Sequence, residues 1–390
     1  MPRAIARILI AVLAVGCTSG QRPGASTLAP RDTASPPAAT STTTVVVPSP
    51  PASLTARSTF AFRETLRRDD AILSDIVAYE GGFIAVGCVR FPPEPPTEGP
   101  CERGLILRSP DGRSWRELAV PGAEQRWITA VADTPLGLLA FAMTQESEPP
   151  RSRAAWRSLN GDDWEPFTID APSAVLFDLG VALDGATVLF GADSGYDFGV
   201  QTEAWATTDG RTWTHGTAPL TPKVATSSGV IAVGVECVDL CAPDQALSVW
   251  RSSDGLTWLA DSDVPAEMAG LSPAAVVGYD GRTVVAGTAS LEAGSGETVV
   301  WQDAPGGWER ATIPDALGAT AGRLLVIGTT MLLTAERQAD GQPLAWSSID
   351  GQAWTPAHVD GVEGATIAAW AGSDPFAVLV DESSIWLLEP

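Results

Sequence analysis

The sequence predicts an all-β protein, a seven-bladed β-propeller of four-stranded blades closed by an N-terminal strand. Three observations lead to this prediction. A nine-residue unit, Trp-Arg-Ser-Ser-Asp-Gly-Leu-Thr-Trp at 250–258, recurs with substitutions at 107–115, 156–164, 205–213 and 346–354, and in shortened form at 301–308. The copies lie 45 to 50 residues apart, and self-similarity at such a period indicates a repeat architecture. Each period also holds four short apolar runs separated by Gly, Asp and Pro, a pattern typical of strands.

The repeated unit predicts a β-hairpin. Asp-Gly between two apolar or β-branched runs is a strong turn signal, because glycine accepts the positive φ that tight turns require. We expect a three-residue loop at 253–255 with Gly255 left-handed, which places Trp250 opposite Trp258 as an aromatic pair worth ~0.5–1 kcal/mol. A two-residue loop would pair Arg251 with Trp258 instead. The hydroxyl of Ser252 is expected to bind loop amides, and the shorter copy at 301–308 requires a different turn.

The number of blades follows from the two ends of the repeat region. Strands are expected in the first period at 72–78, 83–89, 104–108 and 115–120. After Trp354 only 36 residues remain, which is enough for three strands. The nine residues 58–66 supply the missing fourth strand and complete one period. We therefore expect a propeller domain at 58–390 whose first strand pairs with 385–388, since ring closure removes open sheet edges.

The first 16 residues predict a secretory signal peptide. Two arginines precede the apolar run 8–15 and the small residue Gly16, as in the charged, apolar and cleavage regions of such signals. The apolar run is too short to span a bilayer as a helix. The segment 13–17, Leu-Ala-Val-Gly-Cys, resembles the lipobox of bacterial lipoproteins, although Ala14 stands where leucine is more usual. The alternative is an ordinary signal peptide with an incidental cysteine.

The lipobox resemblance implies that Cys17 is diacylated and becomes the mature N-terminus. Membrane contact through that lipid anchor would place the protein on the outer side of the cytoplasmic membrane. Residues 17–57 are rich in Ser, Thr, Ala and Pro and lack a core-forming period. Such a composition cannot bury enough apolar surface to fold. We expect this segment to be a disordered tether.

The charge balance excludes one class of partner. The chain has 24 basic and 47 acidic residues, a net charge of −23. Removal of Arg3 and Arg7 with the signal peptide leaves 22 basic residues and a net charge of about −25. Nucleic acid and anionic lipid surfaces require cationic faces, so neither is an expected partner.

The four remaining cysteines suggest two disulfides, since an even number in an exported chain favours pairing. Cys88 and Cys101 belong to the first blade, and Cys237 and Cys241 to the fourth, across the ring. We expect pairing within each blade, because the Cα atoms of a disulfide lie only about 4.4–6.8 Å apart. A metal site at Cys237 and Cys241 is the alternative, but no histidine lies near them. No metal or other cofactor is expected.

The units resemble Asp-box (BNR) repeats, written Ser-x-Asp-x-Gly-x-x-Trp and found in sialidases, other glycoside hydrolases and secreted propellers. The resemblance covers about residues 58–390. This sequence departs from the pattern because Asp and Gly are adjacent, as in Asp111-Gly112. WD-type repeats fit less well because their Gly-His and Trp-Asp pairs are missing, and kelch repeats would require more than the isolated Gly-Gly doublets present.

Blade order sorts the loops into two faces. The Asp-Gly turns share one face with the turns between first and second strands, and the resemblance implies that this face is scaffold. The long second-to-third-strand loops and the connections between blades share the other face, where we place the candidate ligand-binding residues. These are Asp193, Tyr196, Asp197, Glu203, Glu236 and Asp239.

The residues favour a binding module over an enzyme. His215 and His358 follow outer-strand tryptophans, so we expect them at the periphery, where they cannot form a central catalytic set. A sialidase would require an arginine triad, a Tyr/Glu nucleophile pair and an acidic Asp, and no such set is matched. We predict a membrane-anchored extracytoplasmic binding or scaffolding module of the cell envelope, with a protein, glycan or cation as partner. The alternative is a glycan-active hydrolase of Asp-box type, which uses two carboxylates.

Overall fold

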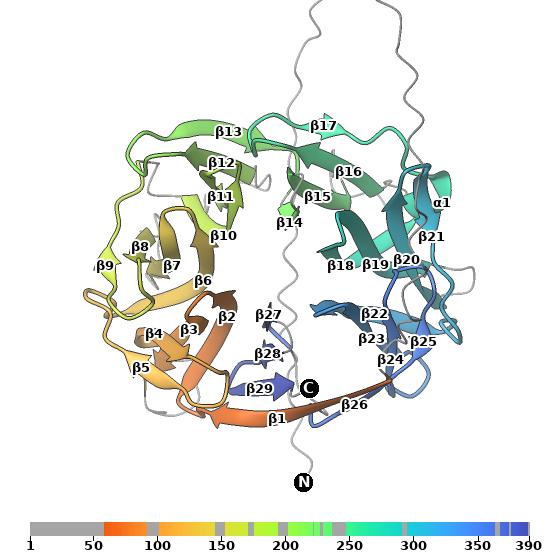
Figure 1. Cartoon of the computed structure of the whole chain (residues 1–390), viewed down its shortest axis with the longest axis horizontal. Coiled ribbons are helices and arrows are strands. Elements are labelled where there is room, and N and C mark those ends of the chain that lie inside the picture. Colours follow the sequence, from red (N-terminus) through yellow and green to blue (C-terminus); the bar gives the residue numbers. More distant parts are fainter. Residues whose placement is uncertain are drawn as a thin grey trace, which may run out of the picture.

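The computed structural model is a ring of seven β-sheets (Figure 1), and the axis that their first strands surround is called the channel. It describes residues 58–91, 101–144, 153–170, 175–193, 202–220, 222–226, 229–235, 247–290, 295–362, 367–373 and 376–388. The expected signal peptide, Cys17 and the tether lie outside these residues. Within the described ranges, no helix is long and apolar enough to cross a membrane.

Each of the first three blades is a four-stranded antiparallel sheet whose strands run outward from the channel in chain order. Blade one contains β2 (Ala71–Tyr79), β3 (Gly82–Arg90), β4 (Cys101–Ser109) and β5 (Arg116–Leu118). Blade two contains β6 (Arg126–Thr134), β7 (Gly137–Thr144), β8 (Arg153–Ser158) and β9 (Glu165–Pro166). Blade three contains β10 (Val175–Leu183), β11 (Ala186–Asp193), β12 (Thr202–Thr207) and β13 (Thr214–Ala218).

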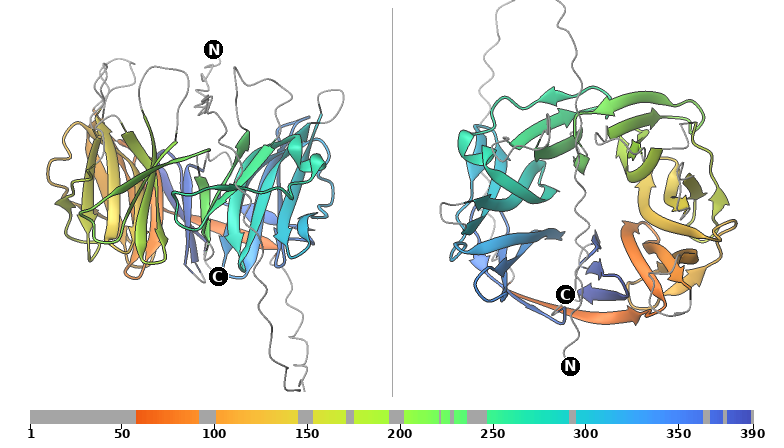
Figure 2. Two further views of the ribbon diagram at one scale, coloured as in Figure 1. Left: turned by 90° about the horizontal axis from the view of Figure 1, so that it is seen from above. Right: turned by 180° about the vertical axis from the view of Figure 1, so that it is seen from behind.

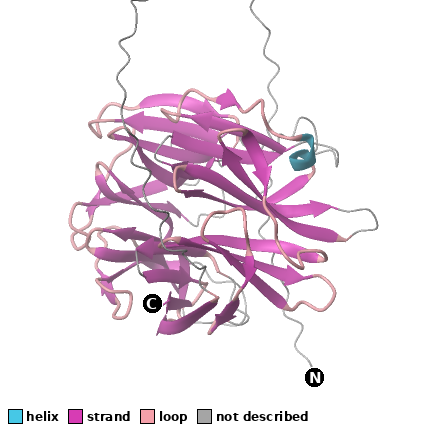
Figure 3. Cartoon of the chain, turned by 45° about the vertical axis from the view of Figure 1, so that its right-hand side comes forward, coloured by secondary structure: helices cyan, strands magenta, loops and turns pink. Residues whose placement is uncertain are grey.

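Blades four to six repeat this order. Blade four contains β14 (Pro222–Thr226), β15 (Gly229–Val235), β16 (Leu247–Ser252) and β17 (Leu259–Ala260). Blade five contains β18 (Leu271–Tyr279), β19 (Arg282–Ser290), β20 (Gly296–Ala304) and β21 (Gly307–Arg310). Blade six contains β22 (Ala319–Ile327), β23 (Thr330–Arg337), β24 (Pro343–Ser348) and β25 (Thr355–Pro356). The one helix in the described part of the chain, α1 (Ala266–Ala269), connects blades four and five (Figure 3).

Blade seven joins the two ends of the chain, as the sequence predicts. It contains β27 (Ala369–Ser373), β28 (Phe376–Val380), β29 (Ser384–Leu388) and the N-terminal strand β1 (Thr59–Arg67). β1 pairs antiparallel with β29, Phe62 opposite Leu388 and Glu64 opposite Trp386. It also pairs in parallel with β26 (His358–Asp360), which arrives from blade six and makes this sheet five-stranded. The expected closure is therefore confirmed, with an additional strand that ties blade six to blade seven.

The hydrophobic core lies between neighbouring sheets rather than in the centre of the ring. One cluster of buried residues joins Ala85 and Leu107 of blade one to Val378 and Leu387 of blade seven. Similar clusters join the other neighbouring blades. Strands buried on both faces explain the nearly continuous apolar run of Phe83–Val89, every residue of which except Gly87 is a buried hydrophobic residue. The innermost strands line the channel (Figures 1 and 2).

The predicted register of the repeated hairpin is wrong. Trp250 pairs with Ala260 and Arg251 with Leu259, so Trp258 lies in the loop and not opposite Trp250. The loop is longer because the Asp254 carboxylate accepts the N–H groups of both Leu256 and Thr257, at 2.8 and 2.7 Å. These bonds to a charged acceptor outweigh one aromatic cross-strand pair. Gly255 is left-handed, with φ of +74°, as expected.

The second tryptophan of the unit folds back onto its own turn. The indole N–H of Trp354 donates to the Gly351 carbonyl at 3.0 Å, and that of Trp115 donates to Gly112 at 3.1 Å. The serine before the turn binds loop amides as expected, since the Gly351 N–H donates to Ser348 Oγ at 2.9 Å. In the copies at 107–115 and 346–354 the loop is therefore capped from the inside by its own serine and tryptophan, whereas the indole N–H groups of Trp164, Trp213 and Trp258 have no such partner.

Candidate functional site on the channel wall

The two faces of the ring separate as the loop order predicts. A cavity of about 370 Å³ lies between blades one and two. It is lined both by turns between first and second strands and by the repeat turn of blade two. Tyr79 and Gly81 come from the first kind of turn, and Ser158 and Asn160 from the second. The repeat turns therefore share this face, here called the turn face. The opposite side is called the long-loop face.

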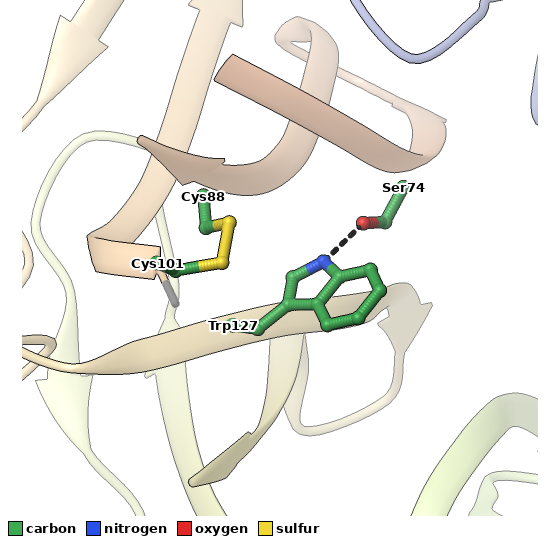
Figure 4. Close-up of a disulfide and its surroundings, with 4 residues drawn as sticks. All are labelled: Ser74, Cys88, Cys101 and Trp127. Atoms are coloured by element: carbon green, nitrogen blue, oxygen red, sulfur yellow. Dashed lines mark hydrogen bonds between the residues drawn. A yellow bond between two sulfur atoms is a disulfide. The ribbon is translucent and has the colours of Figure 1, made fainter. Parts of the chain in front are cut away.

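The first predicted disulfide is confirmed. Cys88 near the end of β3 bonds to Cys101 at the start of β4, with Cα atoms 5.7 Å apart, and both side chains are buried. Figure 4 shows Trp127 of blade two beside this disulfide, where its indole N–H donates to Ser74 Oγ at 2.7 Å. The disulfide thus holds the long-loop end of blade one where it meets blade two. Cys237 and Cys241 lie outside the described residues.

Of the six candidate binding residues, only Asp193 and Glu203 lie in the described ranges. Glu203 lies on β12, and its carboxylate contacts Nε2 of His215 on the outermost strand β13. The centroid of the His215 ring lies 4.5 Å from that of the Trp205 ring. Asp193 ends β11. Tyr196, Asp197, Glu236 and Asp239 are outside the described residues. The one candidate whose side chain can be placed therefore contacts an outer strand.

Both histidines are peripheral, as expected. His215 is on an outer strand, and His358 lies on β26 with its Nε2 2.7 Å from the Asp360 carboxylate. In the ranges that the structure describes, no three His, Cys, Asp or Glu side chains gather in an arrangement suited to a metal ion.

A feature that the sequence analysis missed recurs on the innermost strands. In β2, β6, β10, β18 and β22 the pairing with the second strand shifts after the third residue, which leaves one additional residue in a β-bulge. The fourth residues are Ser74, Thr129, Asp178, Ala274 and Gly322. β14 has a similar shift at Lys223, the single lysine of the chain. A bulge bends the strand and redirects side chains, and here it does so beside the channel.

Polar side chains at or beside the bulges are exposed or half-buried. Asp178 is exposed although Phe177 before it is buried, and Thr129 is half-buried between buried neighbours. Arg323, next to the bulge residue of β22, is also exposed. A single polar residue that interrupts an apolar run at its fourth or fifth position is the sequence signal that could have identified this wall.

Asp75, beside the bulge of blade one, joins two blades. Its two carboxylate oxygens accept the N–H of Ile76 at 2.8 Å and that of Val131 in blade two at 2.9 Å. Burial raises the pKa of Asp75 to about 7, although the two N–H groups favour the ionised form. The residue as a whole is half-buried, whereas its carboxyl group is enclosed. Since both oxygens are engaged by backbone groups, Asp75 connects blades one and two along the channel.

Comparison with solved structures shows the propeller fold. The chain is similar to the β-propeller domain of the Trilobed protease from Pyrococcus furiosus, described as having an open velcro topology (12% identity, 83% of this chain and 94% of that chain, TM-score 0.54). It is similar to an acylaminoacyl peptidase from Pyrococcus horikoshii (11% identity, TM-score 0.54), covering 84% of this chain and 52% of that one. A Trypanosoma rangeli sialidase also matches (13% identity, 71% of this chain and 56% of that one, TM-score 0.37). No family model and no curated protein matches the sequence.

Proposed function

We propose that this seven-bladed propeller is a lipid-anchored, extracytoplasmic binding module without catalytic activity, which meets a cell-envelope partner through its long-loop face. The lipobox-like segment 13–17 and the Ser/Thr/Pro-rich tether 17–57 support the anchoring. A tether of about 40 residues spans ~35 Å as a flexible coil and up to ~120 Å if extended as polyproline II. The ring would thus stand off the membrane and reach partners in the envelope.

The observation that carries this proposal is the difference between the two faces. On the turn face, the polar groups of the repeat turns are used internally. The Asp209 carboxylate accepts the N–H groups of Thr212 and Arg211, which hold its pKa down to about 2. On the innermost strands, by contrast, Arg323 is exposed, and it has no acidic partner among the described residues. Polar groups that fold stability does not consume are the ones available to a partner.

The test of the binding face is a crosslinking pull-down from intact cells with two matched variants of the full chain. Thr129→Arg introduces a bulky cation on the channel wall, and Leu159→Arg introduces the same cation on the turn face, where Leu159 is 77% exposed. We expect Thr129→Arg to lose the crosslinked partners and Leu159→Arg to keep them. Equal capture by both variants, or loss only with Leu159→Arg, would contradict the proposed face.

The anchor is tested separately. Metabolic labelling with palmitate is expected to label the wild-type chain and to sediment it with membranes. Cys17→Ser should remove both the label and the sedimentation, because a single thiol carries the diacyl group. Unlabelled wild-type chain recovered from the medium would refute the anchor without affecting the assignment of the binding face.

A further inference from the structure

Arg323 lies in a β-bulge of the innermost strand of blade six. It follows Gly322 in the bulge of β22, and its backbone N–H donates to Thr334 Oγ1 at 3.0 Å. A Cβ at Gly322 would lie 3.0 Å from the same oxygen. A side chain at Gly322 would therefore crowd Thr334, and the hydrogen bond to Thr334 holds the backbone of Arg323 in place.

The guanidinium of Arg323 has no acidic partner among the described residues. Its Nη2 donates to the Ile367 carbonyl, at the entrance to blade seven, at 2.7 Å. A guanidinium has five N–H donors, so most of its capacity remains. By contrast, Arg68, Arg108 and Arg251 each bind at least one carboxylate. Burial lowers the pKa of Arg323 with no acid to oppose it, while the side chain stays in contact with water. Both facts fit a cation in the wall of a water-filled channel.

The residues at the position of Arg323 in the two neighbouring blades are small. In the strand pairing, the equivalent position is Ala275 in blade five and Ala369 in blade seven. In blade one it is Asp75, the carboxyl group already bound to the Val131 N–H. The equivalent positions of the two neighbouring blades are thus alanines, and both carboxylate oxygens of Asp75 are bound to backbone N–H groups.

We propose that Arg323 is the binding residue for an oxyanion, a carboxylate or a phosphate, carried by a ligand that enters the channel from the long-loop face. Planar guanidinium groups bind such oxyanions through two parallel N–H···O bonds. A chain with net charge −23 repels anions in general, so a cation that has no acidic partner in the described part of the chain confers selectivity for a ligand that reaches it. This inference rests on the proposed function and names the chemical group that the binding module recognises.

The experiment is a titration of the full chain in non-ionic detergent. Binding is measured by isothermal titration calorimetry at matched ionic strength. One arm uses inorganic phosphate, the other acetate and glucuronate, with sodium chloride and glucose as references. We expect at least one arm to bind, and Arg323→Gln to weaken that binding about tenfold or more. Arg323→Lys should retain part of the affinity. Arg282→Gln, which removes an exposed arginine at the hairpin turn of blade five, should leave it unchanged.

The results distinguish a phosphate ligand from a carboxylate ligand, and they show whether Arg323 binds either. Binding in one arm alone identifies a phosphate or a carboxylate ligand. Binding in neither arm, binding equal to that of glucose or chloride, or unchanged binding by Arg323→Gln overturns the site. If Arg323→Gln and wild type capture the same crosslinked partners while no oxyanion binds, the oxyanion site is rejected and the proposed function stands. Circular dichroism melting of each variant checks that the ring is intact.

Discussion

Two neighbouring joints of the ring are held by different interactions. Between blades three and four, the repeat turn of blade four packs against blade three. A Cβ at Gly255 would lie 2.6 Å from Val188 Cγ1, so the turn backbone touches the neighbouring sheet directly. The ring of Trp258 meets that of Phe190 edge-on, with centroids 6.0 Å apart. This joint is apolar and closely packed.

Between blades four and five the corresponding contact is missing. The shortened copy folds as a tight hairpin in which Ala304 pairs with Gly307, and a Cβ at Gly306 or Gly307 would meet nothing within 4 Å. A hydrophobic cluster still joins these two blades, and a charged network adds to it. Arg251 of blade four lies 2.9 Å from the Asp303 carboxylate of blade five and 3.0 Å from that of Asp261.

The Asp261 carboxylate also accepts the indole N–H of Trp308 at 3.1 Å, and the Arg251 guanidinium lies over the Trp308 ring at 5.6 Å. The comparison shows that the repeat turn has two roles. It caps its own hairpin, and its glycine admits the preceding blade. Where the repeated unit is one residue shorter, a polar network adds to the hydrophobic cluster between the blades, and salt weakens such a network but not an apolar contact.

The largest expected effect comes from filling the apolar joint. Gly255→Val places a β-branched residue at a φ of +74° and drives a side chain into Val188. Left-handed strain and overpacking together are expected to lower the free energy of unfolding by roughly 2–5 kcal/mol, measured by urea denaturation. Gly306→Ala, in the equivalent turn of blade five, has open space and should change it by less than about 0.5 kcal/mol. Similar losses from both variants would remove the distinction between the joints.

The charged joint should respond more weakly and to different conditions. Arg251→Gln leaves the half-buried Asp261 without its cation, and we expect a loss of roughly 1–3 kcal/mol at low salt. Arg157→Gln, at the equivalent repeat position, breaks a pair with the exposed Glu165 and should cost about 0.5 kcal/mol. Hydrogen exchange of β16 and β20 should accelerate in 1 M salt in the wild type. Acceleration of β11, in blade three, to the same degree as β20 would show that the two joints do not differ.

Much of the fold could be predicted from the sequence because its information is periodic. The spacing of Trp115, Trp164 and Trp213 sets the blade length, and the shortage of residues after Trp354 requires a strand from the other end. β1 beside β29 confirms that closure. Periodicity does not specify local hydrogen bonding, however. The hairpin register was mispredicted because the Asp254 carboxylate binds two loop amides, and residue spacing alone does not reveal that preference.

The candidate site was harder to predict than the fold. The six candidates, five acidic residues and Tyr196, belong to the expected long loops, but the Glu203 carboxylate lies on β12 and contacts His215 on an outer strand. The wall residues Thr129, Asp178 and Arg323 were overlooked because they lie inside apolar strand runs. Their exposure depends on a bulge, and a bulge is a property of the pairing between two strands rather than of either strand's sequence. Only the register makes it visible.

The smallest expected effect lies on the channel side of the joint between blades one and two, where a charge takes part in an otherwise apolar contact. The pKa of Asp75 is raised to about 7 from about 3.9 in the unfolded chain. Between these values the folded state binds more protons than the unfolded state. Stability from this group is therefore fully present below pH 4 and is lost as the pH rises through 7.

Full conversion of that shift gives an upper bound of about 4 kcal/mol, and the partial contact of Asp75 with water reduces it. We expect a decline of roughly 1–2 kcal/mol between pH 4 and pH 7, measured by urea denaturation across that range. Asp75→Asn keeps an oxygen for one N–H and cannot ionise, so its profile should be flatter by that amount. The turn aspartates act in the opposite direction, because N–H donors lower the pKa of Asp209 and Asp111 and their contribution is lost only below about pH 4. The contrary result is a free energy of unfolding that rises from pH 4 to pH 7 in the wild type, with a parallel rise in the Asn variant. That result would show that Asp75 ionises in the folded state at little cost. The joint between blades one and two would then depend on pH no more than the packed joint between blades three and four.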